Sequence, residues 1–187
     1  MEKLLKLDLG CGKDKKDDCI GIDIRKQPCV DLVIDLEKGI PLDDNSVDYI
    51  YTAHFLEHVN NYDFIMSEIY RVCKNKAIIE IYVPHFSGIS GYQEDHKRFF
   101  RYDCFKCFDK EISEVMTYNI NFKLLKKELH LFRRWYLPLN PLMEWILKLN
   151  KRFNSFYEMT ILRYLFPCFE IYTKLEVVKD LRSADKE

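Results

Sequence analysis

The feature that most constrains the fold is residues 4–24, where two short apolar runs each end at residues suited to a ligand. The first run ends in the turn Gly10-Cys11-Gly12, and the second ends in Asp23. Such runs predict buried parallel strands. Glycines permit a tight turn and close approach of a ligand, and a carboxylate can accept two ribose hydroxyls. The segment predicts a nucleoside-type site at the carboxyl ends of the strands, with an ordinary strand-to-loop turn as the alternative.

A dinucleotide site fits this segment less well. The dinucleotide fingerprint has a third glycine where this chain has Lys15. Its acidic residue also lies about 20 positions beyond the glycines, whereas Asp23 follows Gly12 much sooner. The short interval predicts that the helix connecting the first two strands is short or missing.

The composition indicates one folded domain. The chain has 187 residues, is 48% hydrophobic and has a net charge of −1, which suits a substantial core and does not favour general nucleic-acid binding. We find no secretory signal and no apolar run long enough to span a bilayer. Seven scattered cysteines are typical of reduced cytoplasmic proteins. We therefore expect a cytoplasmic protein with one domain over residues 1–179 and a charged tail at 180–187.

Hydrophobic periodicity predicts the remaining elements. Five further strands are expected at residues 31–36, 47–51, 77–83, 119–131 and 170–179. Residues 61–74 are expected to form an amphipathic helix capped by Asn61, and residues 102–108 a short helix. Residues 142–156 are expected to form a helix whose apolar stripe is Leu142, Ile146, Leu149, Phe153 and Phe156. This order of elements is typical of an α/β layer fold.

Five motifs occur in the order found in one known family. They are LDLGCG at residues 7–12, GIDI at 21–24, DLVIDLEKGIPLDDNSVDYIYTAHFLEHV at 31–59, then EIYRVCK and IIEIYVPHFS. The pattern resembles the class I S-adenosylmethionine-dependent methyltransferases, closest to the type-11 methyltransferase-domain proteins. The resemblance implies a Rossmann-like three-layer α/β sandwich with a seven-stranded, mostly parallel sheet and an antiparallel last strand. It divides the domain into a cofactor-binding half, 1–87, and a substrate half, 88–179, with a helical insertion at about 133–167.

The resemblance also implies S-adenosylmethionine as cofactor. Residues 10–12 would hold its methionyl end, Asp23 its ribose hydroxyls and Asp35 its adenine amino group, with the Leu36 backbone as a donor. The full implied set is Asp8, Gly10, Cys11, Gly12, Asp23, Ile24, Asp35, Leu36, Thr52, Ala53 and His54. Residues 13–18 replace the helix usual in the family, so we expect different contacts there.

His85 and His96 are the candidate catalytic bases. His85 follows a predicted strand at the edge where open α/β sheets bind ligands, and histidine titrates in the range needed to take a proton from oxygen or nitrogen. The alternative is that His85 is structural. No metal site is expected, because Cys104 and Cys107 lack the second cysteine pair of a structural zinc site. His58 is also interpreted as structural. Asp95, Lys97 and Arg98 suit either an anionic substrate or a solvated loop.

The first functional hypothesis is transfer of a methyl group to the oxygen or nitrogen of an unidentified acceptor, with a small molecule favoured. The alternatives are a non-catalytic cofactor-binding scaffold or partner subunit, and a dinucleotide-dependent enzyme. Helix 142–156 lies near Trp135, Tyr136, Trp145 and several basic residues. We expect it to pack on its own sheet, to cover the acceptor pocket, or to form a homodimer or membrane-surface contact.

Overall fold

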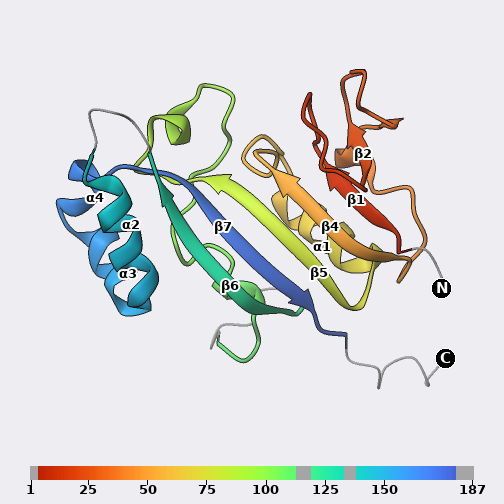
Figure 1. Cartoon of the computed structure of the whole chain (residues 1–187). Helices are drawn as coiled ribbons and strands as arrows, with labels where there is room; N and C mark the ends of the chain where they lie inside the picture. The colour runs from red at the N-terminus through yellow and green to blue at the C-terminus, as the bar shows by residue number, and fades with distance from the viewer. Residues whose placement is uncertain (1–3, 113–118, 133–137, 180–187) are drawn as a thin grey trace.

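The computed structural model of the chain describes residues 4–112, 119–132 and 138–179. A seven-stranded sheet crosses the molecule in the order β3-β2-β1-β4-β5-β7-β6 (Figure 1). Its strands are β1 Lys6–Leu9, β2 Ile20–Asp23, β3 Leu32–Val33, β4 Val47–Ala53, β5 Cys73–Pro84, β6 Phe122–Leu131 and β7 Cys168–Val177. Strands β1 to β5 pair in parallel, and β7 is antiparallel to β5 and β6. The predicted fold class is confirmed.

Helix α1, Tyr62–Val72, covers one face of the central strands. Its apolar residues Ile65, Met66 and Ile69 are buried, and the Asn61 side chain accepts a hydrogen bond from Phe64 N (3.1 Å), which caps the helix as predicted. Leu7, Ile50 and Ile79 are fully buried in the same core. The periodicity of this segment therefore predicted both the helix and its buried face.

The opposite face of the central strands carries polar and aromatic side chains that are half-buried. The Tyr49 hydroxyl donates to Glu80 Oε2 (3.1 Å), and Lys174 Nζ lies 3.3 Å from Glu80 Oε1. Tyr82 and Tyr172 pack beside them with tilted rings whose centroids are 4.9 Å apart. Alternation along β4, β5 and β7 thus separates an apolar face from a polar one.

The connection between β1 and β2 contains no helix, as the short interval predicted. Gly10 N donates to Ile22 O (2.8 Å), and Lys16 N donates to the buried carboxylate of Asp8 (2.7 Å). Lys15 Nζ reaches Asp31 Oδ2 at 2.7 Å. These contacts fold residues 10–19 back over the strand ends.

The second half of the chain corrects the prediction of a single helix over residues 142–156. Two helices are present, α2 Asn140–Leu149 and α3 Lys151–Met159, and α4 Leu162–Leu165 follows them. They lie together at the β6 end of the molecule (Figure 1). Asn150 separates α2 from α3, because its backbone is extended and its side chain accepts a hydrogen bond from Arg152 N (3.0 Å).

The predicted apolar stripe does not form one buried face. Leu142, Leu149 and Phe156 are each more than half exposed, whereas Met143 and Leu147 are buried. The break at Asn150 ends the register that would have joined positions 142 to 156 on one face. Trp135 and Tyr136 lie outside the described residues.

Two further observations complete the fold. The short helix predicted at residues 102–108 is limited to a 3-10 turn, η3 Lys106–Phe108; η1 Leu36–Lys38 and η2 Ile89–Tyr92 are similar turns. Among the helices described, none has the length and apolar character needed to cross a membrane.

Candidate functional site

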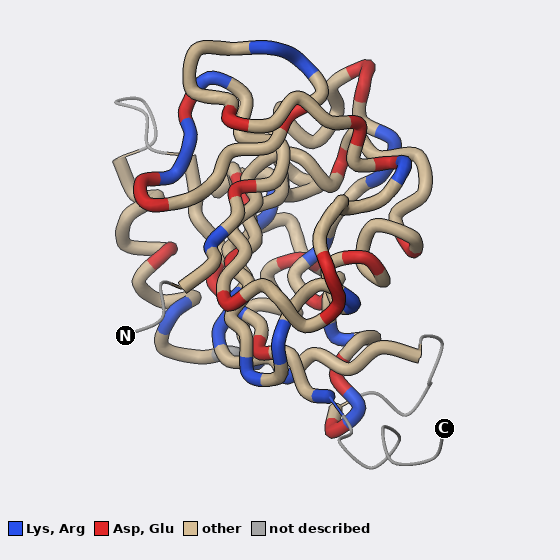
Figure 2. The backbone as a smooth tube through the Cα atoms, turned by 90° about the vertical axis from the view of Figure 1, so that its right-hand side faces the viewer, with Lys and Arg blue, Asp and Glu red and all other residues tan. Residues whose placement is uncertain are grey.

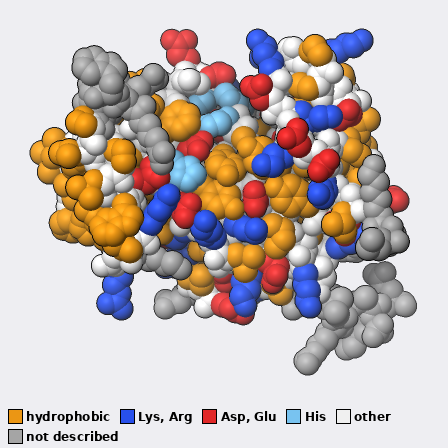
Figure 3. All heavy atoms as spheres, in the orientation of Figure 1, with side chains coloured by type: hydrophobic (Ala, Val, Ile, Leu, Met, Phe, Trp, Pro, Cys, Tyr) orange, Lys and Arg blue, Asp and Glu red, His pale blue; other side chains and the backbone are white. Residues whose placement is uncertain are grey.

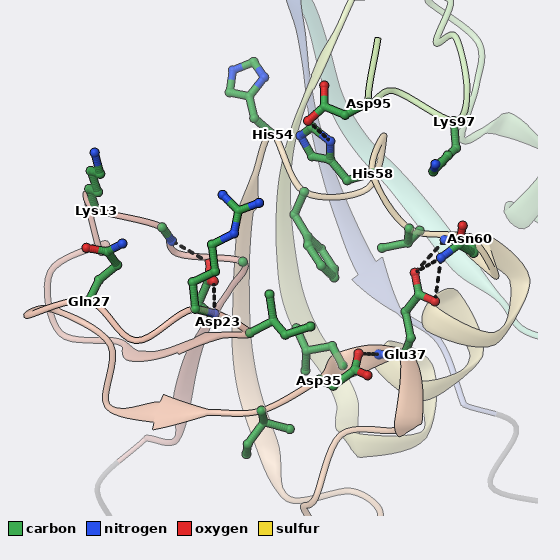
Figure 4. A pocket seen from close by; sticks show the side chains of 18 residues that line it. Lys13, Asp23, Gln27, Asp35, Glu37, His54, His58, Asn60, Asp95 and Lys97 are labelled. Atoms are coloured by element: carbon green, nitrogen blue, oxygen red, sulfur yellow. Dashed lines mark hydrogen bonds and ion pairs between the residues drawn. The ribbon is translucent and has the colours of Figure 1, made fainter. Parts of the chain in front are cut away.

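A pocket of about 670 Å³ opens where β1, β2 and β4 end (Figure 4). Its walls come from the β1–β2 loop, the tip of β2, η1, the loop after β4 and residues 95–97. The lining residues are Gly10, Gly12, Lys13, Asp23, Ile24, Arg25, Gln27, Ile34, Asp35, Leu36, Glu37, His54, Phe55, His58, Val59, Asn60, Asp95 and Lys97. The volume is in the usual range for small-ligand and cofactor sites.

The glycine turn and the acid at the tip of β2 are joined directly. Gly12 N donates to Asp23 Oδ2 (3.0 Å), and Arg25 N donates to Asp23 Oδ1 (2.8 Å). Gly10 and Gly12 have φ angles of +70° and +55°. A Cβ at Gly10 would lie 2.6 Å from Phe55 Cβ, whereas one at Gly12 would meet no atom within 4 Å. The turn is therefore held tight on one side and leaves open space beside Gly12.

Asp35 and Leu36 form another part of the wall, together with η1. The Asp35 carboxylate caps η1 by accepting a hydrogen bond from Glu37 N (3.1 Å), and Leu36 is buried. The Glu37 carboxylate accepts hydrogen bonds from Asn60 N (2.6 Å) and from the Asn60 side chain (Figure 4). This side of the pocket combines a buried apolar residue with carboxylates, which suits a flat ring bearing an amino group.

Four residues of the implied cofactor set do not line the pocket: Asp8, Cys11, Thr52 and Ala53. Asp8 is buried, which raises the pKa of its carboxyl, and it holds the β1–β2 loop through Lys16 N. The Thr52 hydroxyl donates to Leu9 O (3.0 Å) and so joins β4 to β1. Burial raises the pKa of the Cys11 thiol to about 12. The structure places Asp8, Cys11 and Thr52 where they support the wall.

His54 lies at the rim and interacts with two carboxylates. Its Nε2 is 3.1 Å from Glu170 Oε2, and its Nδ1 is 3.3 Å from Glu57 Oε1. Hydrogen bonds to Glu170 and Glu57 outweigh burial and raise the pKa of His54 to about 9. Burial opposes ionisation of Glu170, but hydrogen bonds from His130 and His54 prevail and lower its pKa to about 2. His54 is therefore a cation at neutral pH and cannot act as a base there.

The two candidate bases occupy different places. His85 is fully buried, with Nε2 2.8 Å from Glu158 Oε1 and Nδ1 2.8 Å from Ser87 Oγ, and it does not line the pocket. His96 lies against His58, with ring centroids 4.8 Å apart. The neighbours of His96 in sequence, Asp95 and Lys97, line the pocket. Only His96 is close to the pocket wall.

Sequence reasoning considered residues 95–98 but missed their contact with residues 55–60, which forms another part of the site. Lys97 N donates to Glu57 O (2.7 Å). The Arg98 guanidinium donates to the carbonyl oxygens of Leu56, Val59 and Asn60. Residues 95–98 are thus bound to the loop after β4, although the side chains of Asp95 and Lys97 are exposed. No local pattern marks this contact, because the two segments are distant in the sequence.

Comparison with known proteins identifies a family that matches this chain. Residues 7–81 match the family described as "Methyltransferase domain". No curated protein matches the chain. The match and the fold confirm the predicted resemblance to class I methyltransferases, and with it the prediction of S-adenosylmethionine as the cofactor.

Solved structures with a similar fold cover nearly the whole chain. The YcgJ protein from Bacillus subtilis is 14% identical, with a TM-score of 0.59 over 95% of this chain and 93% of that one. A SAM-dependent methyltransferase from Archaeoglobus fulgidus is 20% identical, with a TM-score of 0.55 over 92% and 86%. A Haloferax volcanii structure with the Trm112 methyltransferase activator is 14% identical, with a TM-score of 0.57 over 96% and 84%. At these identities the likeness shows the fold.

Proposed function

We propose that this chain is a methyltransferase that moves the methyl group of S-adenosylmethionine to the oxygen or nitrogen of an acceptor, with a small molecule favoured. The observation that carries the proposal is the Gly12–Asp23 contact inside the pocket at the strand ends. Each Asp23 oxygen accepts one backbone hydrogen bond, which leaves further lone pairs for ribose hydroxyls. Asp35 and Leu36 line the same pocket at the place expected for adenine.

The cofactor would supply the reactive methyl group on a sulfonium. This chain would hold the two substrates in line and exclude water, since positioning alone can account for much of such a reaction. In the transfer, a bond forms between the acceptor atom and the methyl carbon. The carbon–sulfur bond breaks, its electron pair returns to sulfur, and the acceptor loses its proton.

A second hollow of about 460 Å³ would hold the body of the acceptor. Its lining residues are His130, Leu131, Phe132, Glu144, Lys148, Phe169 and Glu170. Glu170 connects the two sites, because it also pairs with His54 of the first pocket. The mixture of charged and aromatic groups favours an acceptor that has both a polar and an apolar part. His96 is the candidate to remove its proton.

Partners other than the acceptor are proposed from the surface. Basic and acidic residues are mixed along the chain (Figure 2), which fits the expected absence of general nucleic-acid binding. Hydrophobic side chains gather over α2 and α3 (Figure 3); Leu142, Trp145, Leu149 and Phe156 are more than half exposed there. This face is the candidate contact for a second copy or a membrane surface. All seven cysteines are free thiols, which supports a cytoplasmic location.

Calorimetry with S-adenosylmethionine tests the proposal. Asp23→Ala should weaken binding by about 1–3 kcal/mol, because it strands the polar groups that the carboxylate satisfies. Asp17→Ala is the matched control, since Asp17 is exposed and does not line the pocket. Unchanged affinity in a folded Asp23→Ala protein would contradict the assignment.

Single-turnover transfer separates the enzyme from the scaffold alternative. Protein loaded with methyl-labelled cofactor is mixed with cell extracts, and label is followed into small molecules. Transfer that is lost with Asp23→Ala supports the enzyme. Tight cofactor binding without transfer to any fraction supports the non-catalytic scaffold or partner subunit.

A further inference from the structure

Glu57, His58 and His96 form a cluster beside the cofactor pocket. Each offers one potential ligand atom, and these atoms lie within 4.8 Å of one another. The Glu57 side chain is fully buried. Glu57 Oε2 and His96 Nδ1 are both buried and have no hydrogen-bond partner in the described part of the chain. Buried polar atoms without partners are costly and rare, so their grouping here points to a ligand that satisfies them.

The cluster is held by contacts to the backbone of both segments. Lys97 N donates to Glu57 O, and the Arg98 guanidinium donates to carbonyl oxygens on either side of His58. The Arg98 guanidinium also lies over the Tyr62 ring, 4.9 Å from its centroid. These bonds position His96 against Glu57 and His58. Such a supporting shell is what a precise binding site requires.

Asp95 supplies the interaction expected beside a ligating histidine. Its Oδ2 lies 3.2 Å from His58 Nδ1 (Figure 4), which leaves Nε2 for another partner. Histidines that bind metals usually donate the other ring N–H to a carboxylate or carbonyl, which fixes the tautomer. His58 therefore has an orienting group on one side and the cluster on the other.

We propose that Glu57, His58 and His96 bind one divalent transition-metal ion, with zinc as the best fit. Two imidazoles and a carboxylate form a ligand set used by zinc sites that keep an open position, and two imidazoles disfavour magnesium and calcium. Bonds of about 2.0–2.1 Å would draw the ligand atoms about 1 Å closer together. This proposal replaces our expectation from sequence that the chain holds no metal.

The ion would take part in the proposed methyl transfer by binding the acceptor. This role for the ion rests on the proposed function. His58 lines the cofactor pocket, so the open position would face an acceptor beside the cofactor. With the ion bound, His96 would be a ligand and no longer the proton acceptor. An acceptor hydroxyl on the ion would then release its proton to water, because a bound cation lowers the pKa of a coordinated oxygen. The resulting oxyanion would attack the methyl carbon, and the electron pair of the broken carbon–sulfur bond would return to sulfur. The substrate class is therefore an alcohol, phenol or acid.

The test is metal uptake by the whole chain of 187 residues. Protein stripped with a chelator is titrated with zinc chloride by calorimetry, and the bound metal is counted by elemental analysis. We expect one zinc per chain in the wild type, and at least a tenfold weaker Kd in Glu57→Gln, His58→Gln and His96→Gln. Asp95→Asn should weaken binding by about 10–100-fold through the orientation of His58.

Two controls address thiols and folding. The Cys104→Ser, Cys107→Ser protein and the His130→Gln protein should both keep the zinc affinity of the wild type. S-adenosylmethionine binding, measured on each stripped protein, shows that the fold is intact. If wild type takes up no zinc, or if the three ligand variants bind as tightly as wild type, the metal site is overturned. Loss of cofactor binding in the wild type would instead overturn the proposed function.

Discussion

His54 is a charged residue whose stability contribution depends on pH. The pKa of His54 is raised to about 9 in the folded protein, so its contribution is full below about pH 6.5 and is lost as pH rises through about 9. The shift alone corresponds to roughly 3 kcal/mol. The side chain is 39% exposed, and solvent screening reduces this to about 1 kcal/mol.

Urea unfolding at pH 6.5 and 9.5 measures that contribution. Between these two pH values the free energy of unfolding of wild type should fall by about 1 kcal/mol more than that of His54→Gln. His130→Gln is a second test and should also lose less than wild type, because the hydrogen bond to Glu170 raises the pKa of His130 as well. Equal losses in wild type and His54→Gln would contradict the raised pKa.

His96 and His85 give a second prediction at residue scale. His96→Ala should lower turnover by about 10²–10⁴-fold, the usual contribution of a proton acceptor, while sparing cofactor affinity. Loss of a ligand to the proposed ion would also lower turnover, and the zinc titration distinguishes the two roles. His85→Ala should instead lower the melting temperature, because Glu158 would lose its buried partner. Cofactor calorimetry, labelled transfer and thermal melts measure the three properties. Normal transfer by both variants would remove both histidines from the chemistry.

Helix α2 has two leucines that test which of its faces is buried. Leu147 is 2% exposed and Leu149 is 65% exposed. Leu147→Asp should cost several kcal/mol by burying an unpaired charge, whereas Leu149→Asp should change unfolding free energy by no more than about 0.5 kcal/mol. Chemical denaturation compares the two variants. Similar losses of stability in both would contradict the described orientation of α2.

The same pair of variants tests what covers α2 and α3. Sedimentation and cosedimentation with anionic liposomes are measured on wild type and on Leu149→Asp. A dimer, or liposome binding, that is present in wild type and lost in the folded variant identifies the exposed face as the contact. If wild type stays monomeric and does not sediment with liposomes, neither a second copy nor an anionic membrane surface binds this face under those conditions.

The whole molecule should respond to its cofactor, because the pocket walls come from five separate segments. Free cofactor at 100 times its Kd should add about 2.7 kcal/mol to stability. For a chain of this size that raises the melting temperature by roughly 5–10 °C. Differential scanning fluorimetry measures the shift. Asp23→Ala should shift less at the same concentration, and NAD⁺ should give no shift; stabilisation by NAD⁺ instead would favour the dinucleotide alternative.

The sequence by itself determined the elements whose signal is local. Apolar runs marked the strands, the periodicity of residues 61–74 marked α1, and the early Asp23 predicted the missing helix after β1. Gly10, Gly12 and Asp23 could be placed at the pocket because parallel strands end at one edge of the sheet, and the resemblance to the methyltransferases placed Asp35 and Leu36 there.

Only the tertiary structure decided the rest, because those features depend on contacts between distant segments or on one backbone break. The turn at Asn150 changed which side of α2 and α3 is buried, although the periodicity appeared continuous. Folding brought Glu170 to His54 and so made that histidine a cation. It also brought His96 to Glu57 and His58, a grouping with no sequence spacing by which it could have been recognised.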